Sequence, residues 1–146
     1  MVEPCVICQI VREEVPAWIV YQTDTTVCFL PKDLNTIGHT IIAPKEHYTD
    51  LFTLPEQNAG DLMCVAKALT GHYASVLDAV GVNLLHASGK AAQQSVMHFH
   101  FHLLPRYHND EIDAWPTLEN ALVDKDELLM RIRVTHIDAK RNSDNS

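Results

Sequence analysis

The sequence feature that most constrains the fold is the stretch of residues 96–106, in which three histidines alternate with large apolar residues. Successive side chains of a β-strand leave opposite faces, so an alternation of period two is typical of a half-buried strand. This stretch is therefore expected to form a strand with one apolar face and one histidine face. The apolar face consists of Met97, Phe99, Phe101 and Leu103, and the opposite face consists of His98, His100 and His102.

Three imidazoles in one row indicate chemistry rather than a merely polar surface. Histidine changes charge close to neutral pH, and its neutral ring serves both as a nucleophile and as a metal ligand. The row therefore suits nucleophilic attack, proton transfer or metal binding, and the row alone leaves these alternatives open. One alternative is an open, metal-dependent three-histidine site.

Residues 98–104 resemble the His-φ-His-φ-His-φ-φ signature of the histidine triad (HIT) nucleotide hydrolases and transferases, where φ is an apolar residue. The resemblance extends over roughly residues 3–110. Further matching positions fall within residues 5–8, 38–47, 81–96 and 105–107. The Cys5-x-x-Cys8 pair makes the chain similar to the zinc-bearing, bacterial-type members of that family.

The expected fold is α+β, with a mainly antiparallel five-stranded sheet, one long helix and a short N-terminal helix, and it is HIT-like. Strands are expected at 18–21, 26–30, 39–43, 83–86 and the histidine row, and helices at 4–13, between Thr53 and Gly81, and within 117–137. Thr53 begins a capping-box sequence, and Gly81 is the expected C-cap of the long helix. We expect a single domain over 1–138, followed by a polar, mobile tail at 139–146.

Composition and charge argue against several classes of function. The formal net charge is −8, with 11 basic and 19 acidic residues, whereas a nucleic-acid-binding protein normally carries a basic face. A small nucleotide is compatible with this charge, because a pocket can bind phosphate through backbone N–H groups and histidines. No apolar run approaches the ~18 residues of a membrane span. Four cysteines, and a start without a signal-peptide pattern, predict a cytoplasmic protein with reduced thiols.

The resemblance implies a reaction at the α-phosphorus of a nucleotide. In this reaction His100 attacks the phosphorus to form a nucleotidyl-histidine, which water hydrolyses to release a nucleoside monophosphate, without a cofactor. The residues matching His102 and Ser95 contact the phosphate and the leaving-group side, and the residue matching His39 lies beside the nucleophile. The predicted catalytic residues are His100, His102, Ser95 and His39, and the predicted substrate-binding residues are Gln94, Ser95, His100, His102 and Asp33.

The same resemblance implies a structural zinc site. Tetrahedral zinc needs four ligands, of which Cys5 and Cys8 offer two. Zinc-bearing members complete the site with a histidine that matches His47 and with the first triad histidine, here His98. Such a site is closed by protein ligands and stiffens the histidine strand without touching substrate. Two packed free cysteines are the alternative.

Two regions depart from the family pattern. Many relatives carry an Asp that binds the ribose hydroxyls where this chain has Pro31, and Asp33 is a nearby residue that could replace it. In the loop before the triad, Ala87 and Gln93 stand where the family often has Asn and Gly. Glycine there allows positive φ and close backbone approach to phosphate, so Gln93 either alters the anion site or is accommodated.

These observations favour a small HIT-type enzyme that hydrolyses nucleoside 5′-phosphoramidates or related nucleotides. The alternatives are a dinucleoside polyphosphate hydrolase and a nucleotide-binding or scaffold protein without turnover. The resemblance also implies a homodimer. No motif surrounds the histidines at positions 72, 86, 108 and 136, which are expected to be solvated or packing residues.

Overall fold

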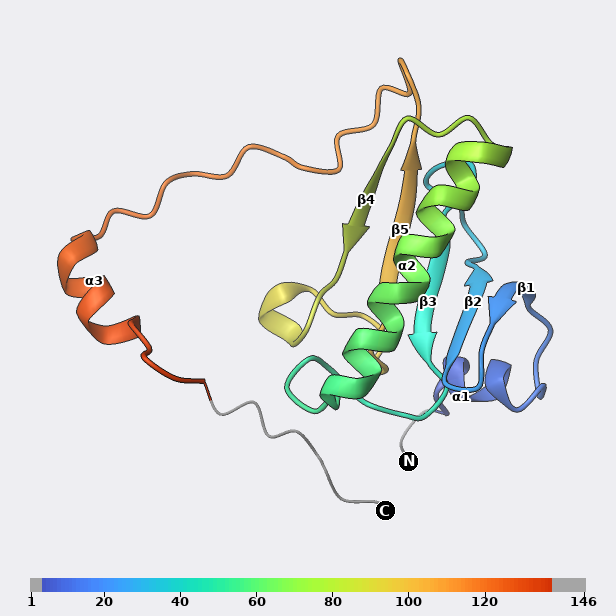
Figure 1. Cartoon of the computed structure of the whole chain (residues 1–146), viewed down its shortest axis with the longest axis horizontal. Coiled ribbons are helices and arrows are strands. Elements are labelled where there is room, and N and C mark those ends of the chain that lie inside the picture. Colours follow the sequence, from blue (N-terminus) through green and yellow to red (C-terminus); the bar gives the residue numbers. More distant parts are fainter. Residues whose placement is uncertain (1–3, 138–146) are drawn as a thin grey trace. The chain divides into compact units, whose positions relative to one another are not determined.

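The structure is a computed structural model that describes residues 4–137. These residues fall into two compact units, 4–110 and 111–137. The larger unit contains an open sheet of five antiparallel strands in the order β1-β2-β3-β5-β4 (Figure 1). The elements of this unit are α1 (Val6–Val11), β1 (Trp18–Gln22), β2 (Thr26–Leu30), β3 (Thr40–Pro44), α2 (Glu56–Val76), β4 (Gly81–Leu85), the 3-10 helix η1 (Lys90–Ala92) and β5 (Phe101–Arg106). The predicted α+β class and five-stranded antiparallel sheet are confirmed.

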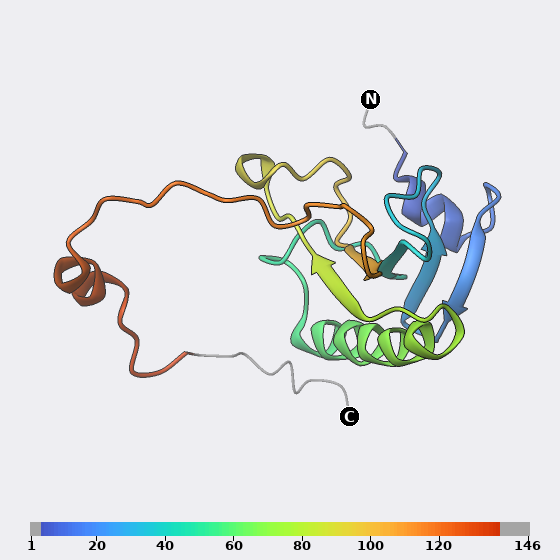
Figure 2. The same cartoon turned by 90° about the horizontal axis from the view of Figure 1, so that it is seen from above.

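Helices α1 and α2 cover opposite faces of the sheet, and each encloses its own core (Figure 2). The core under α2 includes Cys28, Ile42, Leu62, Leu69, Phe99 and Leu103, and the core against α1 includes Ile7, Val27, Phe29, Ile41 and Ala43. Side chains alternate along a strand, so Ile42 faces α2 whereas Ile41 faces α1. His102 pairs with Ile41 across β3 and β5 and therefore lies on the α1 face of the sheet.

The histidine row is only partly a strand, which corrects the prediction for residues 96–106. Strand β5 begins at Phe101, so His102 lies in the sheet. His98 and His100 precede the strand, in a segment without regular secondary structure. The three imidazoles therefore do not share one strand face, and they are free to serve different sites.

The early end of the ladder has a physical cause in β3. The register pairs Ile42 with Phe101, and its continuation would bring Pro44 opposite Phe99. Proline has no N–H to donate, so the β-ladder cannot continue at that position. Phe99 instead donates its N–H to the carbonyl of Tyr48 at 2.6 Å.

The apolar side of the row was predicted correctly at three positions. Phe99, Phe101 and Leu103 pack in the core under α2. The prediction was wrong for Met97, whose side chain is 42% exposed. Met97 and Phe99 both lie before the strand begins, but only Phe99 is packed in the core, where its N–H also bonds to the Tyr48 carbonyl.

The long helix α2 is shorter than predicted at both ends. It begins at Glu56 with Pro55 as N-cap and has no side-chain cap, because the Thr53 hydroxyl bonds to the preceding turn. Its end is set by Asp78, which adopts φ 58°, and not by Gly81, which is the first residue of β4. A residue in the left-handed region ends a helix because the next N–H groups turn back onto the last carbonyls.

The smaller unit contains one helix among the described residues, α3 (Lys125–Ile132), where a helix within 117–137 was predicted. Asp124 begins it, because the carboxylate accepts two N–H groups of the first turn. Apolar residues at partly helical spacing before Asp124 lie outside the helix.

The tail predicted at 139–146 lies outside the described residues, and a single domain over 1–138 stays a prediction. Within 4–137, no helix is both long and apolar enough to cross a membrane.

Candidate active site and metal-binding group

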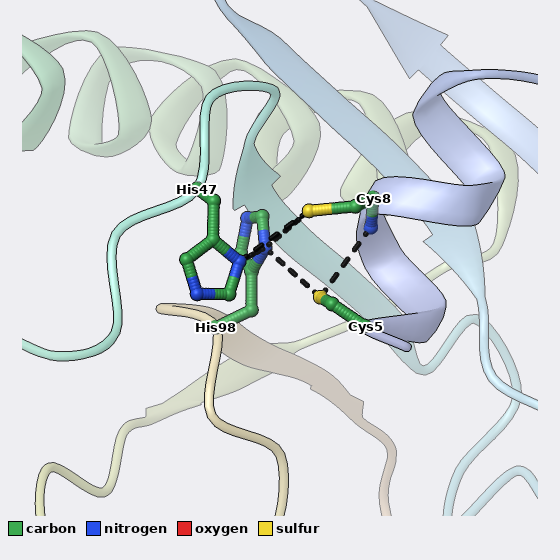
Figure 3. Close-up of side chains that lie close together, drawn as sticks. All are labelled: Cys5, Cys8, His47 and His98. Carbon is green, nitrogen blue, oxygen red and sulfur yellow. Dashed lines mark hydrogen bonds between the residues drawn. The ribbon is translucent and has the colours of Figure 1, made fainter. Parts of the chain in front are cut away.

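Four potential metal ligands from separate segments meet beside α1 (Figure 3). Cys5 and Cys8 come from the start of α1, His47 from the loop after β3, and His98 from the segment before β5. Their ligand atoms all lie within 4.8 Å of one another. Cys5 Sγ is 3.3 Å from His98 Nδ1, and Cys8 Sγ is 3.3 Å from His47 Nδ1. The structure thus groups the four predicted ligands so that they could hold a metal ion.

The ring of His98 is oriented by the backbone. Its side chain is fully buried, and Nε2–H donates to the carbonyl oxygen of Pro44 at 2.8 Å, since a carbonyl can only accept. Nδ1, which faces the thiols, therefore carries the lone pair of the neutral ring. Burial lowers the pKa of His98, although the bond to Pro44 opposes this shift. The ring is thus held neutral, with Nδ1 available as a ligand.

His100 is oriented by a similar bond. Its Nδ1–H donates to the carbonyl oxygen of His98 at 2.8 Å. Nε2 is therefore the ring nitrogen with the lone pair, and it is the atom available for nucleophilic attack. Burial lowers the pKa of His100, which favours the neutral, nucleophilic form near pH 7.

His102 is tied to His39 by a directed chain of hydrogen bonds. The backbone N–H of Asn35 donates to His39 Nδ1 at 3.1 Å, so the proton of the neutral His39 ring is on Nε2. That Nε2–H lies 3.0 Å from His102 Nδ1, which must accept. His102 therefore carries its proton on Nε2 and presents a donor. Burial, reinforced by the neighbouring His100 and His39, lowers the pKa of His102 to about 4.

His100 and His102 line a cavity between α1 and the sheet. Its volume of about 440 Å³ lies within the ~300–1,000 Å³ typical of small-molecule sites. Ser95, His100 and His102 supply polar groups, whereas much of the remaining wall is apolar and includes Ile7, Ile10, Trp18, Phe29, Ile41 and Val96. The cavity thus offers apolar surface for a planar ring beside groups able to bind an anion.

The loop before the triad is held by the side chain of Gln94. Its amide oxygen accepts the N–H of Gly89 at 2.7 Å, and its amide nitrogen donates to the carbonyls of Thr49 and Val96. The side chain is only 7% exposed. The Gln94 side chain is thus engaged with backbone, and it positions the loop that leads to Ser95.

The predicted substrate residue Asp33 is exposed and lies outside the cavity lining. Pro31 and Lys32, its neighbours in the sequence, do line the cavity. Gln93 adopts φ 68° and ψ 29°, the left-handed conformation for which glycine is the usual residue.

Sequence reasoning missed His86 and Ser88, which follow β4. His86 bonds to the backbone of His100 and to Ser88. The one available signal was a histidine and a serine two residues apart in the loop that leads to the triad.

Within residues 4–137, Nε2 of the half-buried His100 ring has no hydrogen-bond partner, and His102 beside it has a fixed proton. With the largely apolar cavity that both rings line, they define a site suited to nucleophilic histidine chemistry. Residues 12–109 match the HIT domain family, and the chain belongs to this family.

Relatives and solved structures agree with this assignment. The chain is 34% identical to the adenosine 5′-monophosphoramidase HNT1 of Saccharomyces cerevisiae over 79% of this chain and 72% of the yeast protein. The structure of a HIT family protein from Bacillus anthracis is similar with a TM-score of 0.75 and 30% identity, covering 90% of both chains. A Zn-bound histidine triad family protein from Mycobacterium smegmatis is similar with a TM-score of 0.73 and 31% identity, covering 79% of this chain and 84% of that one.

Proposed function

We propose that the protein is a nucleotide hydrolase that acts at the α-phosphate through a nucleotidyl-histidine on His100 and releases a nucleoside monophosphate. The observation that carries the proposal is the orientation of His100, whose Nδ1–H is bonded to the His98 carbonyl while the ring lines the cavity. Nε2 is then left with its lone pair. The similarity to a named adenosine 5′-monophosphoramidase favours phosphoramidates as substrates.

Each step of the proposed reaction has a residue to support it. His100 Nε2 attacks the α-phosphorus of the phosphoramidate protonated on nitrogen and forms a P–N bond. The bond from phosphorus to the substrate nitrogen breaks, and the amine leaves in its neutral form. The positive charge that develops on the ring is stabilised by the His98 carbonyl that accepts from Nδ1. His102 Nε2–H donates to a phosphoryl oxygen, and Ser95 donates on the leaving-group side. Water then attacks phosphorus and releases a proton to solvent, and the P–N bond to His100 breaks, which restores the neutral ring and releases the nucleoside monophosphate.

We also propose that the group of Cys5, Cys8, His47 and His98 binds a structural zinc ion. Zinc bonds of about 2.3 Å to sulfur and 2.0–2.1 Å to nitrogen give a tetrahedron with edges of roughly 3.3–3.8 Å. The separations between ligand atoms include 3.1 Å between the two Nδ1 atoms and 3.6 Å from Cys8 Sγ to His98 Nδ1. Two thiols and two imidazoles are a donor set that zinc prefers, and the Zn-bound mycobacterial relative supports this choice.

In this proposal the zinc ion takes no part in the hydrolysis reaction. All four ligands are protein atoms, and neither His100 nor His102 belongs to the group. The zinc would anchor α1 and the triad segment, and the reaction needs no further cofactor. A homodimer, which the resemblance implies, and a cytoplasmic location, which the reduced cysteines favour, belong to the same proposal.

The test is release of AMP from adenosine 5′-phosphoramidate by wild type and His100→Ala, each with and without chelator. We expect chelator-resistant turnover that falls at least ~1,000-fold in His100→Ala, because the nucleophile is lost. The exposed His108 gives a matched control, since His108→Ala removes the same ring away from the cavity. Retained turnover in His100→Ala would refute the nucleophilic role. A diadenosine polyphosphate assayed in parallel distinguishes the alternative hydrolase, and binding without turnover would indicate a nucleotide-binding protein.

A further inference from the structure

His86 is the first residue after β4, and its ring is fixed by two aromatic neighbours. It stacks on Phe99 with ring centroids 4.3 Å apart and an interplanar angle of 28°. It also meets Phe101 edge-on at 5.8 Å. Phe99 is 1% exposed, so His86 rests on the core under α2. An imidazole held in this way presents its two nitrogens in fixed directions.

Both nitrogens of His86 have partners, and the partners determine where the proton lies. Nδ1–H must donate to the carbonyl oxygen of His100 at 2.9 Å, because a carbonyl only accepts. Nε2 then accepts from the hydroxyl of Ser88. The Ser88 oxygen in turn accepts the N–H of Leu51 at 2.8 Å, which leaves its hydroxyl proton for His86. The chain of donors thus runs from the backbone of Leu51 to the backbone of His100.

The His100 carbonyl lies at the point where the β-ladder stops. β5 begins one residue later, so His100 lies just outside the regular strand ladder that fixes Phe101. The bond from His86 takes the place of a ladder bond. His100 is then held at two points, through its carbonyl by His86 and through its ring by the His98 carbonyl.

We infer that His86 and Ser88 form a positioning pair that fixes the backbone of the nucleophile His100. This inference rests on the proposed function, because it assigns the pair to the reaction of His100. Misplacement of a reacting group by about 1 Å can slow a reaction about 100-fold without loss of substrate binding. The pair therefore acts on kcat more than on KM.

Two amide substitutions test the contributions of the two His86 ring nitrogens one at a time. His86→Asn places an amide nitrogen near the position of Nδ1, so it can still donate to His100. His86→Gln places its amide near the position of Nε2 and cannot replace that bond without moving. We expect AMP release by His86→Asn to keep kcat within about threefold of wild type. His86→Gln and His86→Ala should lose about 10- to 100-fold in kcat, with KM changed by less than about twofold.

Thermal unfolding and His108→Ala serve as controls. His86→Asn and His86→Gln remove the same ring and the same stacking on Phe99, so a purely structural role would lower their kcat equally. Equal kcat in these two variants, or wild-type kcat in His86→Ala, would overturn the inference. The comparison of the two amides stays decisive if His86→Ala does not fold.

A second measurement does not depend on turnover. ¹⁵N NMR of the His86 ring should show the Nδ1–H tautomer in wild type and a loss of that preference in Ser88→Ala. An Nε2–H tautomer in wild type would refute the pair whether or not the protein is active. If wild type releases no AMP and retains the Nδ1–H tautomer, the proposed function fails together with the kinetic role, and the hydrogen-bonded pair remains as a structural feature only.

Discussion

His39 Nε2 lies 3.0 Å from His102 Nδ1, and the backbone N–H of Asn35 already occupies the other nitrogen of His39. This relationship decides the proton position on both rings. His39, which is 2% exposed, donates to His102, and His102 is left with a proton on Nε2. His39, which precedes β3, thus determines that His102 presents a donor to the cavity and not an acceptor.

Replacement of His39 by amides should show this dependence. His39→Gln places an amide nitrogen near the Nε2 position and can still donate to His102, whereas the shorter side chain of His39→Asn cannot reach. We expect kcat for AMP release to fall by roughly 10- to 100-fold in His39→Asn, by analogy with the effect of removing a hydrogen-bond partner of a metal-bound histidine. His39→Gln should retain more activity. Equal losses in the two variants would show that His39 acts through packing alone.

Acid should destabilise the fold through the same pair. Burial lowers the pKa of His39, and burial with neighbouring histidines lowers that of His102 to about 4, against about 6.5 in the unfolded chain. Between these pH values the unfolded state binds more protons than the native state, so the free energy of unfolding decreases as pH falls from 6.5 towards 4. Urea unfolding with chelator present, which removes pH-dependent metal binding, measures this dependence, to which the lowered pKa values of His98 and His100 also contribute. His102→Gln should flatten it; an unchanged slope would exclude His102 as its source.

The predictable part of the fold follows from local periodicity. Phe99, Phe101 and Leu103 could be assigned to one buried side because alternation is a property of neighbouring residues. The start of β5 could not be predicted, because it depends on Pro44 of another strand. The helix end at Asp78 was missed for a different reason: an aspartate takes the left-handed conformation for which glycine is the usual signal.

Zinc removal should weaken the fold and spare the reaction. A ligand that binds only the native state at about 1,000 times its Kd stabilises by roughly 4 kcal/mol, which corresponds to roughly 8–16 °C in the unfolding temperature of a chain of this size. We expect about one zinc per chain by metal analysis and a decrease in Tm of this order with chelator. Cys8→Ser should lower metal content and Tm together. A metal-free protein with a chelator-independent Tm would support packed free cysteines instead.

The candidate site shows the same division between what sequence can and cannot reveal. The Cys5-x-x-Cys8 pair and the triad are recognisable because a family keeps these residues at fixed spacing, and the structure groups Cys5 and Cys8 with His47 and His98. His86 carries no such signal, since a side chain that bonds to a backbone carbonyl leaves the partner's residue type unconstrained. Such contacts become visible only when the topology is known.

Gln93 should be a position where glycine improves stability relative to alanine. Its φ of 68° lies in the left-handed region, which costs a residue with a Cβ about 1–2 kcal/mol. Glycine avoids this cost, but its larger entropy in the unfolded chain offsets about 0.5–1 kcal/mol of the gain. We therefore expect Gln93→Gly to be more stable than Gln93→Ala by about 0.5–1 kcal/mol in urea unfolding. Both variants remove the glutamine amide. Equal stabilities would therefore show that the left-handed φ at position 93 carries no measurable strain.

Gly38 should tolerate no side chain, because it combines positive φ with close packing just before His39. Its φ is 87°, and an added Cβ would lie 2.8 Å from Leu77 Cδ1 and 3.1 Å from Pro105 Cγ. The tip of Leu77 can move, whereas the ring of Pro105 lies in β5 and is fully buried. We expect Gly38→Ala to lower the free energy of unfolding by about 2–4 kcal/mol, from backbone strain and overpacking together.

Gly89 provides the matched control for Gly38. It has φ 90°, but an added Cβ would meet no atom within 4 Å, so Gly89→Ala carries the backbone strain without the overpacking. Gly38→Ala should therefore lose about 1–3 kcal/mol more than Gly89→Ala in urea unfolding. It should also lower kcat as His39→Asn does, because any shift of the backbone at Gly38 moves the donor to His102. Equal destabilisation by the two alanines would mean that Leu77 and Pro105 relax without cost.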